Sequence, residues 1–317
     1  MKIILPAFVM PALEEATCAL LETCEFVVIK EDGTFSGSPE GAEVLMLPWH
    51  LPDATRKRLF SLPTLTWVHT VSAGVEHALD EQLRSLDVTL TNASGVFDLP
   101  IAETVLTYIL MIAKRMPEFA AQQQAHEWEQ LHLREAADLT IGLVGAGSIG
   151  TEIARLCQAL EMRIIATRRH PERDAPHVDE VLPAADLDVL LGRADVVVLA
   201  VPITEETRGM LGADEFRQMP AEAWLVNIAR GAVVDEPALI EALQTGEIAG
   251  AALDVFTEEP LPPTSPLWEM ANVIITPHNS WSTPHVKARE AALFLKNLRR
   301  YLRDEPLLNV VDKELGY

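Results

Sequence analysis

The chain has 317 residues, of which 49 % are hydrophobic, and its formal net charge is −22. That length allows two ordinary domains, each with a core of its own. The negative charge argues against nucleic acids and anionic membranes as partners, because their phosphates would be repelled. The apolar runs are too short for a membrane span, which needs about 18 uninterrupted apolar residues.

Cysteine usage points to a reducing compartment. The three cysteines, Cys18, Cys24 and Cys157, are too few and too scattered for a disulfide framework or a metal site. We therefore expect reduced thiols, no metal and a cytoplasmic location. The start of the chain is interpreted as a first β-strand rather than a signal peptide, because Pro11 and two glutamates interrupt its apolar run.

In the first hundred residues, short β-branched runs alternate with stretches of helix-like spacing. Alternation of this kind predicts a parallel sheet with helices on both faces. The predicted strands are residues 2–5, 25–29, 43–47, 66–70 and 88–90.

A different pattern occupies residues 100–138. Residues 100–116 carry apolar side chains at helical spacing, and Pro100 stands where a helix can begin. We expect a long connecting helix there. Residues 122–138 are rich in Gln and charged residues and are predicted to form a polar arm.

A second alternating series begins at Leu139. Its apolar runs lack polar alternation, as expected for parallel strands that are buried on both faces. A helix is predicted over residues 236–245, with Pro237 at its start and Gly246 just after its end. The predicted strands are residues 139–144, 163–167, 195–201, 223–229, 250–256 and 272–278.

A G-x-G-x-x-G motif follows the first strand of this series and opens a helix. This context is typical of a dinucleotide-binding turn, in which glycines allow close approach of a pyrophosphate. The helix N-terminus then offers N–H groups to the phosphate charge. The alternative is a glycine-rich turn without a ligand. The residues expected to bind the cofactor are Gly145, Ala146, Gly147, Ser148, Ile149 and Gly150.

The end of the next strand carries Thr167, Arg168 and Arg169, where such a unit usually has an acid for the cofactor ribose. Guanidinium groups can bind a 2′-phosphate through paired hydrogen bonds, and the Thr167 hydroxyl can add another. We therefore expect NADP(H) as the preferred cofactor and NAD(H) as the alternative. The other interpretation of the two arginines is a pair of solvated surface residues.

Three polar residues, Arg230, Glu259 and His278, stand at or just beyond the ends of later strands. Ligands bind at the carboxyl ends of strands in open α/β sheets, so the three can converge on one cleft. Reduction of a ketone needs a proton, which a His can donate when a carboxylate keeps it protonated and oriented. An Arg can bind a substrate carboxylate and polarise the keto oxygen. Taken one at a time, Arg230 could also be an ion-pair partner, Glu259 a loop charge and His278 a buried histidine.

Several segments resemble the D-isomer-specific 2-hydroxy acid dehydrogenase family. They run through most of residues 139–285 and are highly specific together. The matching segments are GLVGAGSIG, VVLAVPITEETRGML, LVNIARGAVVDEPALIEALQTGEIAGAALDVFTEEPLP and SPLWEMANVIITPH. Nearer the start of the chain, TVSAGVEH (70–77) and IAETV (101–105) are also similar to family segments.

The resemblance implies an α/β fold with two doubly wound parallel-sheet domains and a cleft between them. A flavodoxin-like substrate domain would comprise residues 1–97 and 286–317, and a Rossmann-like dinucleotide-binding domain residues 98–285. The family's catalytic Arg, Glu and His correspond to Arg230, Glu259 and His278. Family members are usually dimers, so a homodimer is expected.

Binding residues are carried over from the same resemblance. The substrate carboxylate would be held by Arg230 and by backbone N–H groups of Ala73 and Gly74, and Asp254 matches a residue near the nicotinamide. The other positions that match residues lining the cofactor are Val201, Pro202, Thr207, Ile228 and Ala229.

Within the family, LPWHLP, the EWEQL arm and the final GY are similar to the glyoxylate/hydroxypyruvate reductase branch. Trp49 would then face the substrate pocket, unless it packs between domains. Trp281 stands where the family usually has a small residue, which leaves the size of the pocket open. Glu259 argues against a formate dehydrogenase, whose corresponding residue is a Gln.

The predicted function is therefore NAD(P)H-dependent reduction of a small 2-oxo acid, of the glyoxylate or hydroxypyruvate type, to the D-2-hydroxy acid. Two alternatives stay open. One is a D-3-phosphoglycerate dehydrogenase, whose substrate phosphate would need extra basic residues in the pocket. The other is a dinucleotide-sensing corepressor, which the same fold can support.

Overall fold

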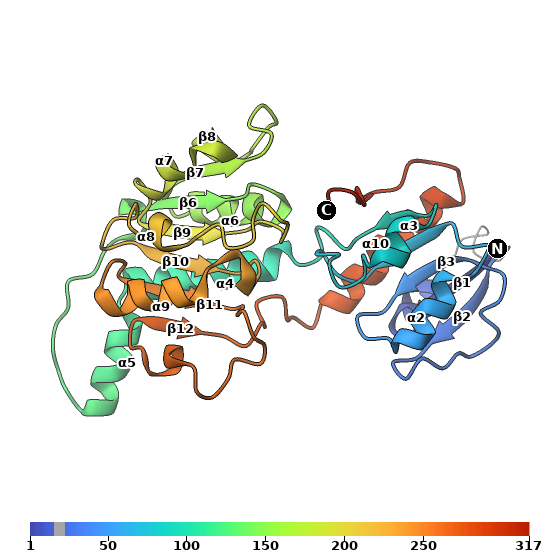
Figure 1. Ribbon diagram of the computed structural model, residues 1–317, viewed down its shortest axis with the longest axis horizontal. Helices are drawn as coiled ribbons and strands as arrows, with labels where there is room; N and C mark the ends of the chain where they lie inside the picture. The colour runs from blue at the N-terminus through green and yellow to red at the C-terminus, as the bar shows by residue number, and fades with distance from the viewer. Residues whose placement is uncertain (16–22, 317) are drawn as a thin grey trace. The chain divides into compact units, whose positions relative to one another are not determined.

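The computed structural model describes residues 1–15 and 23–316, and the chain divides into two compact units (Figure 1). Unit 1 comprises Met1–Phe97 and Thr283–Tyr317, and unit 2 comprises Asp98–Ser282. Cys18 and the final tyrosine of the GY pair lie outside the described residues. Each unit is built on one parallel sheet, which confirms the predicted fold class.

Unit 1 contains five parallel strands in the order β2-β1-β3-β4-β5, which is the flavodoxin-like order. Ile3, Ile4 and Leu5 are fully buried, as the middle of a sheet covered on both faces requires. The strands are β1 (Lys2–Pro6), β2 (Glu25–Ile29), β3 (Ala42–Leu47), β4 (Trp67–Thr70) and β5 (Thr89–Thr91).

Helices cover both faces of this sheet. They are α1 (Met10–Glu15), α2 (Asp53–Phe60), α3 (Glu81–Ser85) and α10 (Val286–Tyr301). On one face α10 packs with α1, and Phe294 and Tyr301 each stack on Trp67 at a ring-centroid distance of 5.3 Å. On the other face Phe60 of α2 and Leu83 of α3 complete a separate core. The last helix of the chain is therefore part of the unit that the first residues form.

Unit 2 contains seven parallel strands in the order β12-β11-β10-β9-β6-β7-β8. This is the Rossmann order with one more strand at the β12 edge. The strands are β6 (Thr140–Val144), β7 (Arg163–Arg168), β8 (Glu180–Pro183), β9 (Val196–Leu199), β10 (Trp224–Asn227), β11 (Gly250–Leu253) and β12 (Val273–Ile275).

The helices of unit 2 also lie on both faces of its sheet. They are α4 (Asp98–Ala113), α5 (Met116–Ala125), α6 (Ser148–Gln158), α7 (Leu187–Leu191), α8 (Ala213–Phe216) and α9 (Glu236–Thr245). The last three pack on one face through Leu191, Phe216 and Leu239. α4 and α6 pack closely against each other.

Two details differ from the sequence prediction. The connecting helix predicted over residues 100–116 ends at Ala113, because Arg115 takes a left-handed φ of 50°. α5 then begins and includes the first residues of the predicted polar arm. β8 was not predicted, since its four residues are half-buried or exposed at a sheet edge and lack a strong apolar pattern.

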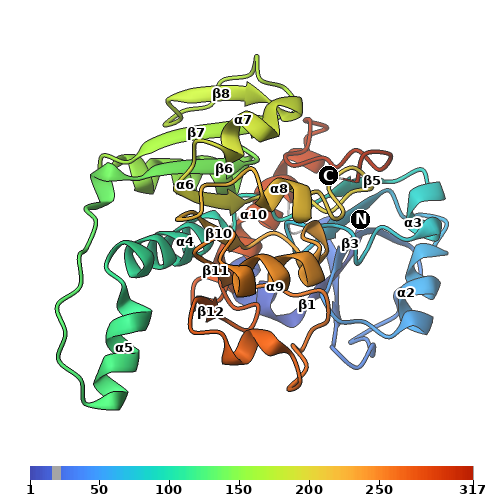
Figure 2. The same cartoon turned by 60° about the vertical axis from the view of Figure 1, so that its left-hand side comes forward.

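α5 and the segment that follows it extend away from the sheet of unit 2 (Figures 1 and 2). Within the described residues α5 buries no side chain, and Trp128 after it is 97 % exposed. Among the helices of residues 1–15 and 23–316, none is long and apolar enough to cross a membrane. In the same residues, no cluster of three His, Cys, Asp or Glu side chains is placed to hold a metal ion.

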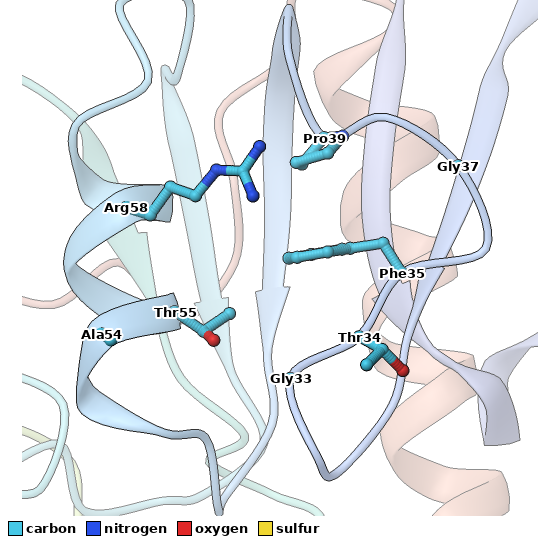
Figure 3. Close-up of a pocket in the computed structure, with 8 residues that line it drawn as sticks. All are labelled: Gly33, Thr34, Phe35, Gly37, Pro39, Ala54, Thr55 and Arg58. Atoms are coloured by element: carbon cyan, nitrogen blue, oxygen red, sulfur yellow. The ribbon is translucent and has the colours of Figure 1, made fainter.

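Unit 1 has a surface cavity of about 540 Å³ between α2 and the loop after β2 (Figure 3). The Arg58 side chain reaches from α2 toward Pro39, and the Phe35 ring extends into the space between helix and loop. Arg58 Nη2 already donates to Glu40 Oε1 at 2.8 Å. None of the site residues predicted from the sequence lines this cavity, so it is not the expected site of catalysis.

Candidate active site

The glycine-rich turn follows β6, at the point where the strand order reverses between β6 and β9. Gly145 has a φ of 102°, and a Cβ at this position would lie 2.6 Å from the Ala200 carbonyl oxygen. A Cβ at Gly150 would lie 2.2 Å from the carbonyl oxygen of Gly145. Both positions therefore require glycine. Gly147 is exposed and a Cβ there would meet nothing within 4 Å, so this side of the turn is open to a ligand.

The N-terminus of α6 adjoins the same open side of the turn. Gly147 is its N-cap residue, and no side chain within the described part of the chain caps the helix. No side-chain cap from the described residues therefore competes with an anion at the start of α6, as a pyrophosphate site requires. Ala146 is buried and Ile149 half-buried, and Ser148 Oγ donates to Asp98 Oδ1 at 3.3 Å. This turn fits the phosphates of a dinucleotide.

The end of β7 lies directly against this turn, because Gly145 N donates to the Thr167 carbonyl oxygen at 3.0 Å. Thr167 itself is buried. Arg168 Nη1 donates to the Asp174 carbonyl oxygen at 3.0 Å, and Arg169 forms an ion pair with Glu206. Both guanidinium groups therefore stand beside the nucleotide turn and already have protein partners.

The segments after β9 and β10 continue the same edge of the sheet. After β9, Thr207 Oγ1 donates to the Pro202 carbonyl oxygen at 2.7 Å and accepts from Thr204 N at 2.8 Å. These bonds close the loop on itself. Val201 lies near the glycine-rich turn, since a Cβ at Gly145 would approach its Cγ1 to 2.9 Å. After β10, Ile228 and Ala229 are buried.

Asn227 positions the turn that carries Arg230. Its side chain is buried at the end of β10, where Nδ2 donates to the Arg230 carbonyl oxygen and Oδ1 accepts from Ala229 N, both at 3.0 Å. Arg230 Nη1 donates to the Ala229 carbonyl oxygen at 2.6 Å. A Cβ at Gly231 would lie 1.9 Å from the Phe256 carbonyl carbon. The absence of a side chain at Gly231 therefore lets this turn pass directly against the segment after β11.

His278 and Glu259 form a hydrogen-bonded pair. His278 Nδ1 donates to Glu259 Oε2 at 2.7 Å, and Glu259 Oε1 accepts from Phe256 N at 3.0 Å. His278 has a left-handed φ of 49°, a conformation that costs about 1–3 kcal/mol and needs local support. The backbone N–H of His278 donates to the Asp254 carbonyl oxygen at 2.8 Å, and Trp281 Nε1 donates to the His278 carbonyl oxygen at 2.9 Å. Because Nδ1 is engaged, Nε2 is the ring nitrogen left for a substrate.

One cavity of about 290 Å³ in unit 2 joins these groups. It is lined by Ile203, Arg208, Arg230, Gly231, Ala232, Phe256, Thr257, Glu259 and His278. The structure thus brings Arg230, Glu259 and His278 together on one cavity. Arg208 lines it too and was missed in the sequence, although it directly follows Thr207 in a segment that resembles the family.

A buried carboxylate holds the turn that carries the histidine. Asp254 is fully buried and accepts from Asn279 N at 2.9 Å and Ser280 N at 3.0 Å. Thr276 Oγ1 also donates to it, at 2.5 Å. Tyr108 Oη lies 2.5 Å from Thr276 Oγ1 and must donate there, because the single Thr276 hydroxyl hydrogen is directed at the carboxylate. Burial raises the pKa of Tyr108 to about 12, so the phenol keeps its proton.

This network was not visible in the sequence, because Tyr108 read as one apolar position on a helix face. Both Asp254 oxygens are engaged by the turn. A role for Asp254 next to the nicotinamide stays a prediction.

Unit 1 places its three predicted substrate-binding residues around one loop. Trp49 is 46 % exposed and stacks on His77, with ring centroids 4.4 Å apart. Ala73 and Gly74 lie in the loop after β4, where Ser72 Oγ donates to the Gly74 carbonyl oxygen at 2.6 Å. The same hydroxyl lies 3.4 Å from His77 Nε2. The tryptophan and the loop are therefore linked through His77.

Residues 106–280, more than half of the chain, match the family model described as D-isomer specific 2-hydroxyacid dehydrogenase, NAD binding domain. This chain belongs to the D-isomer-specific 2-hydroxyacid dehydrogenase family. It is thereby an oxidoreductase, and the family predicted from the sequence is confirmed.

Curated relatives fall in the branch that the sequence resembles. The chain is 35 % identical to a glyoxylate reductase of Thermofilum pendens over 259 residues, which cover 80 % of this chain and 76 % of that protein. It is 36 % identical to the glyoxylate/hydroxypyruvate reductase B of Escherichia fergusonii over 266 residues, which cover 81 % of each.

Solved structures of the family share the fold of the whole chain. A D-isomer specific 2-hydroxyacid dehydrogenase of Xanthobacter autotrophicus, in complex with NADPH and MES, has a TM-score of 0.89 and 31 % identity, and the match covers 100 % of this chain and 99 % of that one. An NADPH-dependent glyoxylate/hydroxypyruvate reductase of Sinorhizobium meliloti, in complex with NADP and sulfate, has a TM-score of 0.83 and 30 % identity at the same coverage.

Proposed function

We propose that this protein reduces a small 2-oxo acid, of the glyoxylate or hydroxypyruvate type, to the D-2-hydroxy acid and prefers NADP(H) to NAD(H). The observation that carries the proposal is the single cavity on which Arg230, Glu259 and His278 meet. The names of the curated relatives support the substrate class, and the two structures in complex with NADPH and NADP support the cofactor.

The cofactor would be held by the turn after β6 and by the arginines after β7. The N–H groups at the start of α6 would take the pyrophosphate, and Arg168 and Arg169 would take the 2′-phosphate that distinguishes NADP(H). When bound, the reduced nicotinamide supplies the hydride to the keto carbon.

The substrate would be bound through its carboxylate. Arg230 would form a bidentate pair with that carboxylate and polarise the keto oxygen, helped by the backbone N–H groups of Ala73 and Gly74. Trp49 and Trp281 would keep the substrate-binding roles predicted from the sequence. Both rings are partly exposed, at 46 % and 43 %, and would limit the size of the substrate.

His278 would donate the proton. As the hydride reaches the carbon, negative charge develops on the keto oxygen, and a proton from His278 Nε2 completes the alcohol. Glu259 orients the imidazole, because its carboxylate accepts from Nδ1 at 2.7 Å and leaves Nε2 for the substrate. Asn227 and Gly231 act indirectly, by placing Arg230 against the segment after β11.

A substrate and cofactor panel tests the proposal. The assay compares kcat/KM for glyoxylate, hydroxypyruvate and pyruvate, each with NADPH and NADH, in the wild type and in His278→Ala. We expect the highest value for one of the first two with NADPH, and D-glycerate from hydroxypyruvate by chiral chromatography. A higher kcat/KM with NADH would refute the cofactor preference, and L-glycerate would refute the stereochemistry. No turnover of any acid would leave a dinucleotide-sensing protein as the better account.

The position of Arg208 on the cavity favours a second candidate function. A second guanidinium on the catalytic cavity could bind the phosphate of a phosphorylated 2-oxo acid, as a D-3-phosphoglycerate dehydrogenase would need. Adding 3-phosphohydroxypyruvate to the panel decides between the two. A kcat/KM above that of hydroxypyruvate, lost in Arg208→Gln, would favour the phosphorylated substrate.

We also propose that the protein is a cytoplasmic homodimer. A surface on α5 and the segment after it supports the dimer, since Met116, Trp128 and Leu133 are 47 %, 97 % and 48 % exposed. A second copy that covers them would remove apolar surface from water. Light scattering of the purified protein should give twice the chain mass, and Trp128→Gln should lower it. The proposed location rests on the sequence, whose three scattered cysteines fit a reducing compartment.

A further inference from the structure

The ion pair between Arg169 and Glu206 joins two loops at the edge of the sheet where the cofactor ribose is expected. Arg169 directly follows β7, whose end is hydrogen-bonded to the glycine-rich turn. Glu206 belongs to the loop after β9, 37 residues further along the chain. The Arg169 side chain is 39 % exposed and that of Glu206 is 75 % exposed. The pair is therefore accessible to a ligand.

The loop that carries Glu206 is held in place by its own hydrogen bonds. Thr204 N donates to Thr207 Oγ1 at 2.8 Å, and Thr207 Oγ1 donates to the Pro202 carbonyl oxygen at 2.7 Å. Glu206 lies between these two threonines in the sequence. The closed loop thus keeps the carboxylate next to Arg169.

We propose that Glu206 sets the cofactor selectivity of this protein by competing with the 2′-phosphate of NADP(H) for Arg169. The inference rests on the proposed function, in which the arginines after β7 bind that phosphate. NADP(H) must replace the carboxylate on Arg169 or approach while the carboxylate stays nearby. NAD(H) carries no 2′-phosphate and needs no such exchange. Glu206 therefore weakens NADP(H) binding specifically and moderates the preference that the arginines create.

The neighbouring arginine does not remove this competition. Arg168 Nη1 donates to the carbonyl oxygens of Arg173 at 3.4 Å and Asp174 at 3.0 Å, so part of its hydrogen-bonding capacity holds the loop after β7. Two further carboxylates, Glu172 and Asp174, stand in that loop. A dianionic phosphate therefore approaches arginines that already lie near several carboxylates. Among these carboxylates, removal of Glu206, which is paired with Arg169, should change the affinity for the phosphate most.

The test compares Glu206→Gln with Glu205→Gln. Glu205 is also exposed and makes no ion pair in the part of the chain that the structure describes, so its variant reports the effect of losing one nearby charge. Dissociation constants are measured by fluorescence titration of the whole protein with NADPH, NADH, 2′,5′-ADP and 5′-AMP. The last two ligands isolate the contribution of the 2′-phosphate without turnover.

We expect Glu206→Gln to tighten NADPH and 2′,5′-ADP by about two- to five-fold, the range that exposed ion pairs allow. NADH and 5′-AMP should change less than the measurement error, and Glu205→Gln should have a clearly smaller effect on NADPH. Added salt should shrink the difference, because exposed charges are screened.

Three results would overturn the inference: equal effects of the two variants on NADPH, weaker NADPH binding in Glu206→Gln, or equal tightening of NADPH and NADH. Arg169→Gln separates this failure from failure of the proposed function. If Arg169→Gln leaves NADPH affinity unchanged, the assignment of the 2′-phosphate to Arg169 is wrong. If it weakens NADPH while Glu206→Gln has no effect, only the competition is wrong.

Discussion

His278 Nδ1 donates to Glu259 Oε2 at 2.7 Å, and the second oxygen of the same carboxylate accepts the backbone N–H of Phe256 at 3.0 Å. The carboxylate is thus fixed at both oxygens. It can orient the imidazole ring without free rotation of the Glu259 side chain.

Glu259→Gln keeps the shape of the side chain and removes its charge. Because an amide has only one oxygen, the Gln side chain of the variant cannot accept from both the His278 ring and the Phe256 N–H, so the ring loses part of its orientation. We expect kcat/KM to fall by about ten-fold or more, as for a hydrogen bond to a charged group of about 1.5–3 kcal/mol. Glu258→Gln is the matched control and should keep the wild-type kcat/KM. Dinucleotide affinity is determined in parallel, and an unchanged kcat/KM in a variant that still binds cofactor would exclude Glu259 from orienting the ring.

His278→Ala should lower kcat by about 10²- to 10⁴-fold, the usual contribution of a general acid. Cofactor affinity should stay within about two-fold of the wild-type value. This is a small change, since a ten-fold change in affinity corresponds to about 1.4 kcal/mol. Steady-state kinetics and a titration with NADPH check both values. Wild-type turnover in this variant would mean that another group supplies the proton.

Arg230→Ala should raise KM and lower kcat, because one group both binds the substrate carboxylate and stabilises charge in the transition state. Hydrogen bonds to charged groups contribute about 1.5–3 kcal/mol, so kcat/KM should fall by about ten-fold or more. Arg217→Ala, at an exposed arginine paired with Asp214 on α8, is the control. The same loss in both variants would indicate a general effect of charge and not a role in the site.

Tyr108→Phe removes the donor to Thr276 while it leaves the buried ring in place. The turn that carries His278 should become less ordered, and kcat should fall by about two- to ten-fold, as expected for one hydrogen bond of about 0.5–1.5 kcal/mol. KM should change little. Thr276→Val should lose more activity, and Thr276→Ser should keep most of it.

The control for this tyrosine is Tyr301→Phe. In the wild type the Tyr301 hydroxyl lies 2.6 Å from Thr66 Oγ1 in unit 1. This variant should keep the wild-type kcat. If both phenylalanine variants lose equal activity, or if Tyr108→Phe loses none, the phenol does not position the catalytic turn.

Glu290 on α10 should make stability depend on pH. Burial raises the pKa of Glu290 to about 7. A carboxyl group whose pKa is raised in the folded state favours folding at pH values below the pKa that it has in the unfolded chain. This contribution to stability is lost as the pH rises through about 7. Glu290→Gln should therefore become more stable than the wild type above pH 7, by on the order of 1–3 kcal/mol.

Urea unfolding of the Gln variant and the wild type at pH 5, 6 and 8 measures this difference. It should grow with pH. The exposed Glu314 provides the control, since Glu314→Gln should track the wild type at every pH. A constant difference for Glu290→Gln across this range would contradict the titration.

The sequence by itself determined the two α/β sheets, the glycine-rich turn and the family. Parallel strands are buried on both faces, so apolar runs such as 139–144 and 195–201 stand out in the sequence. Gly145 and Gly150 signal their turn because backbone contacts leave no room for a Cβ. Arg230, Glu259 and His278 could be picked because each follows such a strand, and parallel strands end at one edge.

Only the tertiary structure decided which partner each of these groups has. Glu206 meets Arg169, Tyr108 reaches Thr276 across 168 residues, and Arg208 lines the same cavity as Arg230 and His278. Such pairs depend on the order of strands in the sheet and on the exact path of loops, which local spacing does not encode. Helix spacing marked Tyr108 only as apolar, and its hydroxyl acquired a role when α4 packed beside the turn after β12. The residues that we propose to do the chemistry were therefore visible in the sequence, whereas those that would orient them were fixed by contacts between distant segments.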